Sequence, residues 1–316
     1  MEKESLLNWS WNGRPTTVEE FDSMMTSLDG HLTSLGLLPA QRPLNASLVV
    51  SSTLRLSGTF ILGGSSNRGE PFSPKDLLAR IHDWYEEIYG ERTKIDFSPG
   101  SIVVSTHGNF WEMKIPRTVG QVQAFISADL SHEGNRITTK DSPLAKFNIL
   151  CSLQGMTQAY ANRLSSDDLR LLNEKFHTGS EAVAFLDGLG GHDLFNEARG
   201  DYRHSVDALL TGRELSKARW DTAQCAEKVL KGLLARDGHT YPTYGAQGHD
   251  INHLGGLIKQ KLGIELPATE LTVVHCSTAV RYAKERSTTE QALAAHNALV
   301  QLLSLLAQIS VRPPTN

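Results

Sequence analysis

The feature that most constrains the fold is a change of hydrophobic period near Ser142. Upstream of this point, short runs rich in β-branched and apolar residues are separated by Gly- and Pro-containing breaks, a pattern typical of strands and turns. Downstream, apolar residues recur every three to four positions almost without interruption up to Ile309, as in amphipathic helices. The sequence therefore predicts an α+β N-terminal domain, with an antiparallel sheet and helices, followed by an all-α antiparallel helical bundle.

The length of the chain supports more than one domain. Its 316 residues correspond to about two domains at the usual size of roughly 100–200 residues each. The segment 188–193 (GLGGHD) is the strongest loop signal within the helical part. We therefore expect an α+β domain over residues 1–141, connecting helices over 142–190, and the bundle over 191–312.

The first half contains two helix signals and several strand signals. A Thr-initiated apolar stripe predicts a helix over residues 16–38, and Ser73 followed by Pro74 predicts the capped start of a second helix. The segment 46–64, rich in β-branched residues, predicts two strands or one bent strand. Four short runs between residues 94 and 130 predict an antiparallel meander.

The composition excludes several classes of protein. A net charge of -4 rules out a globally basic nucleic-acid binder, so any contact with RNA requires a local basic patch. Three well-separated cysteines suit a reducing compartment and buried thiols. The N-terminus does not have the pattern of a signal peptide, and no uninterrupted apolar run approaches the ~18 residues that cross a membrane. We expect a soluble, cytoplasmic protein that does not interact with membranes.

The second half resembles a known family. The segments AEKVLKGLLARDG, HDINHLGGLI, AVRYAKE and TTEQALAAHNALVQLL follow one another in the order and type found in HEPN domains. The resemblance covers residues 198–309. It implies a helical bundle of the kind found in ribonucleases, toxin–antitoxin pairs and defence systems, and a homodimer formed through that bundle. The N-terminal domain resembles no recognised family.

The resemblance also implies where a catalytic motif would lie. Catalytic members of the family carry an Arg and, four to six residues later, a His that acts without metal. Arg281 and Tyr282 occupy the matching position, but no His falls within the window, and His296 is too far along. The acid–base partner is therefore missing, and the chain is similar to the non-catalytic branch. A formal Arg–His match occurs only in RGDYRH, where Arg199 and His204 would be the catalytic pair of a displaced site.

The pair His249 and His253 has two interpretations. Residues four apart share one helix face and could bind zinc, with Asp250 in the place of a catalytic glutamate. Alternatively, Asp250 caps the first turn of a helix, where a negative charge is favourable. We favour the helix start, and predict no metal site.

Two further segments are candidate ligand sites. Backbone amides of Gly63, Gly64 and Ser65 could hold a phosphate, because a Gly-Ser turn after an apolar strand resembles the nucleotidyltransferase pattern. That pattern needs two carboxylates for Mg²⁺, and Pro74 occupies the first of these places, so a plain glycine-rich turn is the alternative. Lys228 belongs to a set of basic residues that form either a phosphate-binding face or a solvated helix surface.

These observations predict an HEPN-like module that binds RNA, a nucleotide or a protein partner from a neighbouring component of the same defence or toxin–antitoxin system. The expected binding residues are Arg281, Tyr282, Lys228 and the Gly63–Ser65 turn. Two alternatives remain: a metal-independent endoribonuclease, and a degenerate nucleotidyltransferase–HEPN fusion. The sequence leaves catalysis undecided and indicates no cofactor.

Overall fold

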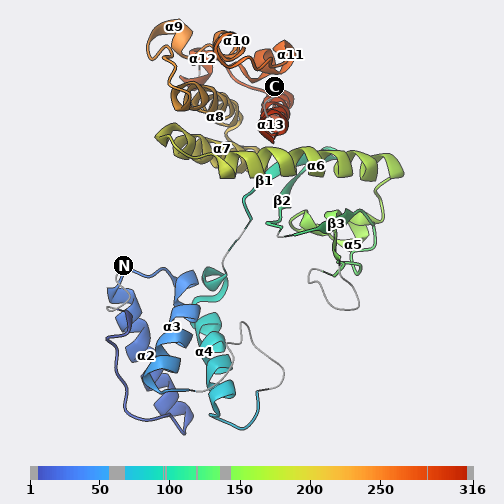
Figure 1. The fold of residues 1–316 in the computed structure, drawn as a ribbon. Coiled ribbons are helices and arrows are strands. Elements are labelled where there is room, and N and C mark those ends of the chain that lie inside the picture. The colour runs from blue at the N-terminus through green and yellow to red at the C-terminus, as the bar shows by residue number, and fades with distance from the viewer. Residues whose placement is uncertain are drawn as a thin grey trace. The chain divides into compact units, whose positions relative to one another are not determined.

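The computed structural model describes residues 6–56, 68–94, 96, 98–118, 120–135, 144–282 and 284–311. The chain forms two compact units, Met1–Asp96 and Phe97–Asn316 (Figure 1). This division differs from the expected boundary at residue 141. The strands that follow residue 100 share one hydrophobic core with the helices of the second unit, so they belong to that unit.

The first unit is helical in its described part. Its elements are α2 (Val18–Ser34), α3 (Arg42–Thr53) and α4 (Pro74–Tyr89), with short 3-10 turns at Pro39–Gln41 and Gly90–Thr93. Thr17 caps α2, and Ser73 caps α4 with Pro74 in its first turn, which confirms the predicted helix starts. The apolar faces of these helices form one core around Met24, Leu28 and Tyr85.

The strands predicted over residues 46–64 are wrong for the described part of that segment. Residues up to Thr53 form α3, and residues 57–67 lie outside the described residues. Ala46, Val49 and Val50 are fully buried, and this i, i+3, i+4 spacing is helical. The β-branched residues therefore pack as one helix stripe, and burial overrides their intrinsic strand preference.

A partly buried ionic cluster joins the three helices of the first unit. The Arg42 guanidinium lies 3.1 Å from the Asp29 carboxylate and donates to the Tyr89 hydroxyl at 2.8 Å. Tyr89 donates in turn to Asp29 at 2.6 Å. Because one residue comes from each of α2, α3 and α4, the cluster fixes their packing.

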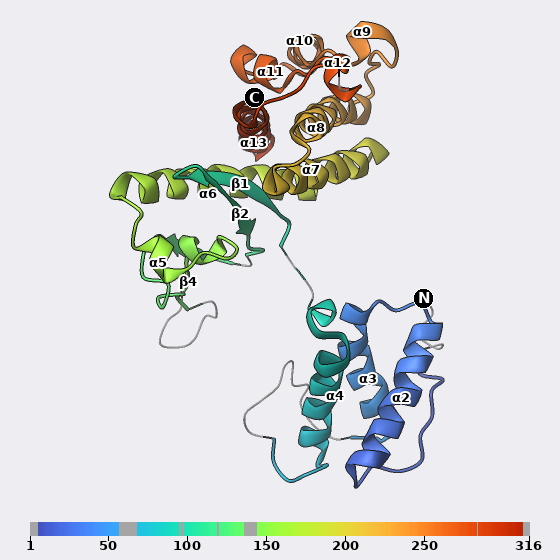
Figure 2. The same ribbon diagram turned by 180° about the vertical axis from the view of Figure 1, so that it is seen from behind.

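The second unit combines two small sheets with a helical bundle (Figures 1 and 2). Its strands are β1 (Gly100–Thr106), β2 (Asn109–Ile115), β3 (Val122–Phe125) and β4 (Ala145–Asn148). A 3-10 turn (Ile149–Ser152) and α5 (Gln158–Ala161) follow. The bundle comprises α6 (Ser166–Gly188), α7 (Asp193–Thr211), α8 (Leu215–Arg236), α9 (Gly245–Gly248), α10 (Ile251–Leu262), α11 (Ala268–Val274), α12 (Thr278–Arg281) and α13 (Thr289–Val311).

The predicted antiparallel meander is only partly correct. β1 and β2 form an antiparallel hairpin whose turn places His107 and Gly108 at positive φ, as a two-residue hairpin requires. β3 instead pairs in parallel with β4, a strand within a segment that we expected to be helical. Residues 145–148 are too short a run for their period to distinguish strand from helix. The expectation of connecting helices over 142–190 is therefore wrong at its start.

The bundle packs in layers behind the hairpin. In both views α6 and α7 lie next to β1, and α8 lies on the far side of α7 (Figures 1 and 2). α13 packs against α6 and α8 and also contacts β1. α7 and α8 run antiparallel and approach closely where Gly232 of α8 faces the Phe195 ring of α7. Among the described residues, α13 is the one helix whose length and apolar composition would suffice to cross a membrane; it packs against α6, α8 and α11 as a core helix.

Candidate binding surface on the helical bundle

A cation in contact with two aromatic rings lies at the surface of α12. The Arg281 guanidinium lies 5.3 Å from the centre of the Trp220 ring of α8 and 5.6 Å from that of Tyr282. Trp220 is buried, whereas the Tyr282 ring is 66% exposed. Such cation–π contacts fix the guanidinium plane while leaving its N–H groups accessible.

Two more exposed cations follow in the chain, Lys284 and Arg286. Glu285 between them lies 3.7 Å from Arg219 and accepts a hydrogen bond from the Ser277 hydroxyl, so its charge is partly neutralised although half of its side chain is exposed. We call Arg281, Tyr282, Lys284 and Arg286 the α12 patch. The patch is a local basic surface on an acidic chain.

The α12 patch is fixed to the start of α8. The Ser287 amide donates to the Ser216 hydroxyl at 3.0 Å, and Cys276 and Val280 pack with Trp220 in a small apolar cluster. Because these contacts hold both ends of the segment, the patch has a defined geometry on the bundle.

Lys228 forms ion pairs within the bundle. Its ammonium lies 2.7 Å from the Asp201 carboxylate and 3.6 Å from that of Glu197, both on α7. Burial lowers the pKa of Lys228, but the hydrogen bond and charge of Asp201 outweigh it and raise the pKa above its usual value. This lysine joins α7 to α8, and its position does not favour the predicted phosphate-binding role.

Arg199 and His204 are not brought together as a pair. The Arg199 guanidinium donates to the carbonyl oxygens of Leu186 and Leu189 at 3.0 and 2.8 Å, and to the Asn196 side chain. It therefore satisfies carbonyl groups at the C-terminus of α6, which lack partners within their own helix. Five residues along α7 correspond to about 140° around the helix axis, so His204 projects from a different face.

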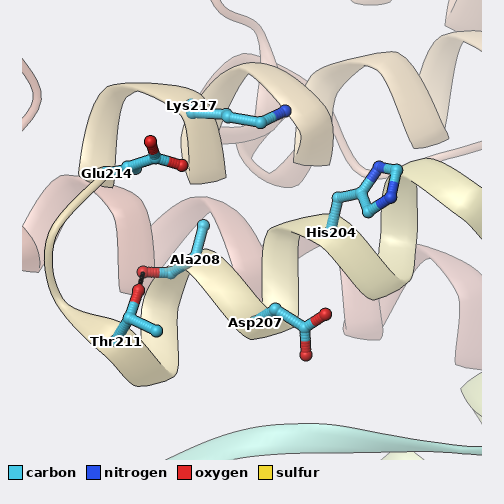
Figure 3. Close-up of a pocket in the computed structure, with 6 residues that line it drawn as sticks. All are labelled: His204, Asp207, Ala208, Thr211, Glu214 and Lys217. Atoms are coloured by element: carbon cyan, nitrogen blue, oxygen red, sulfur yellow. Dashed lines mark hydrogen bonds between the residues drawn. The ribbon is translucent and has the colours of Figure 1, made fainter.

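His204 lines an open groove at the turn between α7 and α8 (Figure 3). The groove has a volume of about 250 Å³, and its other lining residues are Asp207, Ala208, Thr211, Glu214 and Lys217. Lys217 is already paired with the buried Asp221 at 2.7 Å. The carboxylates of Asp207 and Glu214 therefore make the groove acidic, which is unfavourable for an RNA backbone.

The segment around His249 is the start of a helix, as favoured from the sequence. Asp250 is the N-cap of α10, and its carboxylate accepts from the backbone amides of Asn252 and His253. His249 instead approaches the buried Glu227 at 3.0 Å, and Glu227 also accepts from Lys231. Within the described part of the chain, no three His, Cys, Asp or Glu side chains converge in a way that would hold a metal ion.

The remaining sequence candidates lie in the first unit. Gly63, Gly64 and Ser65 fall outside the described residues. Asp76, the remaining carboxylate of the nucleotidyltransferase pattern, accepts from the Phe72 amide and from Arg80 at the start of α4. It therefore acts as a local structural acceptor.

The sequence alone did not identify Trp220 as the aromatic partner of Arg281, or Glu227 as the partner of His249. No local signal identifies them, because each contact joins residues that are far apart in the chain. The fold and the α12 patch define a helical bundle with an attached hairpin and a basic, aromatic surface. In comparison with known families, curated proteins and solved structures, the chain matches none.

Proposed function

We propose that the second unit is an HEPN-like module that binds unpaired RNA through the α12 patch, without cleaving it. The observation that carries this proposal is the Arg281 guanidinium, which makes cation–π contacts with both the buried Trp220 and the exposed Tyr282. The proposal also rests on the resemblance of residues 198–309 to HEPN domains.

The chemistry of the patch suits single strands better than duplexes. An exposed tyrosine ring offers a stacking face for a base, which is accessible only when the base is unpaired. Arg281, Lys284 and Arg286 supply positive charge for the neighbouring phosphates. A free nucleotide fits the same chemistry with fewer contacts, so it should bind more weakly than a strand.

The endoribonuclease alternative is less well supported. Arg199 is occupied by the carbonyl oxygens at the end of α6, and His204 lies in an acidic groove. An RNA-cleaving pair would need both side chains to face one phosphate. The non-cleaving function therefore agrees better with the positions of these two residues.

The setting of this function follows from the family resemblance alone. We propose a cytoplasmic homodimer formed through the bundle, with a role in a defence or toxin–antitoxin system beside a protein partner. The first unit would then supply recognition of that partner.

Binding of a short labelled RNA, measured by fluorescence anisotropy, tests the proposal. We expect single-stranded RNA to bind more tightly than the same sequence in a duplex. Arg281→Ala and Tyr282→Ser should each weaken binding by about 5-fold or more, since one stacked base contributes ~1–3 kcal/mol. Lys261→Ala and Tyr244→Ser are matched controls, because both residues are exposed and lie outside the patch.

Absence of RNA binding, or equal losses in the controls and the patch variants, would overturn the proposal. The same samples, incubated with EDTA and analysed on a gel, test the alternative. EDTA-resistant cleavage that is lost in His204→Ala would establish the ribonuclease instead.

A further inference from the structure

The outer edge of the β-hairpin is held by side chains of the helices. In the β1–β2 ladder, alternate residues of β1 direct their backbone groups away from β2. The Ser101 carbonyl accepts a hydrogen bond from the Tyr202 hydroxyl of α7 at 2.9 Å. The Val103 amide donates to Nε2 of His296 of α13 at 3.0 Å. Two side chains therefore take the place of a neighbouring strand.

Both side chains are deeply buried and lie together. His296 is fully buried, Tyr202 is 3% exposed, and their ring centres are 5.8 Å apart. Because Nε2 accepts a hydrogen bond, the proton of the neutral imidazole is on Nδ1. Nδ1 has no hydrogen-bond partner among the residues that the structure describes.

Protonation of His296 is incompatible with this contact. A proton on Nε2 would point at the Val103 N–H, so two donors would face each other and the hydrogen bond would be lost. The new charge would also lie in the apolar core near the Lys175 ammonium of α6. Burial first, and then the charge of Lys175, lower the pKa of His296 from 6.5 to about 4.

We propose that Tyr202 and His296 form a latch between the hairpin and the bundle, and that protonation of His296 releases the hairpin while the helices stay folded. The hairpin can open as a pair because its ladder is complete between β1 and β2. Ile102, Val104 and Met113 also pack in the core shared with the helices, so the released form is a minor population. Helices α7 and α8 keep their own packing and the Lys228–Asp201 ion pair without it.

The other ionisable groups around the latch are Lys175 of α6, Tyr202 and Asp201 of α7, and Cys225 of α8. Burial raises the pKa of the Asp201 carboxyl, which pairs with Lys228. Lys175 donates to the Asn297 side chain, and burial lowers its pKa. Burial raises the pKa of Tyr202 and of Cys225 on α8, so both stay neutral. Because the pKa of Asp201 is shifted as well, the His296→Gln variant is needed to assign a pH response to His296.

The size of the effect follows from linkage. When the hairpin is released, the His296 imidazole of α13 is exposed to water and recovers a pKa near 6.5, against about 4 when the hairpin is docked. The released form binds the proton more tightly, so the docked form is favoured above the exposed pKa and loses its advantage as the pH falls. From about pH 7.5 to about pH 5 the released population should rise about 25-fold.

Hydrogen exchange of the full chain, measured by NMR and corrected for the intrinsic pH dependence, tests the latch. We expect the protection of the Val103 amide to fall about 25-fold over this pH range, while amides within α8 keep theirs. His296→Gln retains an acceptor that does not titrate, so it should abolish the pH dependence at Val103. His253→Gln, a change at a histidine outside the latch, should leave it intact.

Three results would overturn the proposal. In the first, Val103 shows no excess loss of protection in the wild type. In the second, the α8 amides lose protection together with Val103, which would mean that the whole unit opens. In the third, His296→Gln behaves like the wild type. If that variant fails to fold, the wild-type comparison of Val103 with α8 decides, together with the ¹⁵N shifts of His296, which must indicate the Nδ1–H tautomer.

Discussion

The close approach of α7 and α8 at Gly232 gives a quantitative test of the bundle. A Cβ atom at Gly232 would lie 2.5 Å from Cε1 and 2.9 Å from Cζ of Phe195, whereas carbon atoms normally pack at about 3.5–4.0 Å. Phe195 is fully buried, so its ring cannot move into solvent. Overpacking of this kind costs ~1–3 kcal/mol, and alanine regains about 1 kcal/mol over glycine within a helix. Gly232→Ala should therefore lower the free energy of unfolding by about 1 kcal/mol.

Gly200 on α7 provides the matched control. A Cβ atom there meets nothing within 4 Å, so Gly200→Ala should raise the free energy of unfolding by about 1 kcal/mol. Urea unfolding followed by far-ultraviolet circular dichroism measures both variants. Because the chain has two units, hydrogen exchange of α8 peptides assigns the change to the bundle.

The difference between the two variants, about 2 kcal/mol, isolates the packing contribution from helix propensity. Equal stabilisation by Gly232→Ala and Gly200→Ala would refute the close helix contact. A loss in both would show that glycine is needed in α7 for another reason.

Two further predictions concern α10. Gly255→Ala would place a Cβ atom 2.5 Å from a terminal methyl of Leu271, whereas the Cβ atom of Gly256→Ala would meet nothing within 4 Å. We expect Gly256→Ala to stabilise the fold by about 1 kcal/mol, and Gly255→Ala to stabilise it less or to destabilise it. Thermal unfolding measures both variants. Asp250→Ala removes the cap of α10 and should lower the free energy of unfolding by ~1 kcal/mol, with faster amide exchange confined to the first turn of α10. Asp250→Asn keeps a capping side chain and should lower it less. A uniform loss of amide protection across the bundle would contradict a local capping role.

Local chemistry was sufficient to predict the helix starts. Ser73 with Pro74, and Asp250 before its helix, satisfy amides of their own first turn, so the signal lies within a few residues. The β1–β2 hairpin is predictable for the same reason, since its strands are joined by a turn at His107 and Gly108. Such features need no information from the rest of the chain.

Tertiary packing determines the elements for which the prediction from the sequence was wrong. Val49 and Val50 favour strands in isolation but pack as a helix stripe against α2 and α4. β4 pairs with β3 in parallel, and a parallel pair joins segments that no tight turn connects. Neither the partner nor the direction of such a pair is visible in the local pattern.

The same limit applies to the charged residues of the bundle. Lys228 and Arg281 look alike in the sequence, as cations on helical segments, yet Asp201 neutralises one and Trp220 supports the other at the surface. Each outcome depends on a partner from another helix. Arg199 follows the same rule, because its partners are the carbonyl oxygens that end α6. A binding role for a cation in this bundle therefore has to be argued from what its charge already contacts, and by that criterion Arg281 is a better candidate than Lys228 or Arg199.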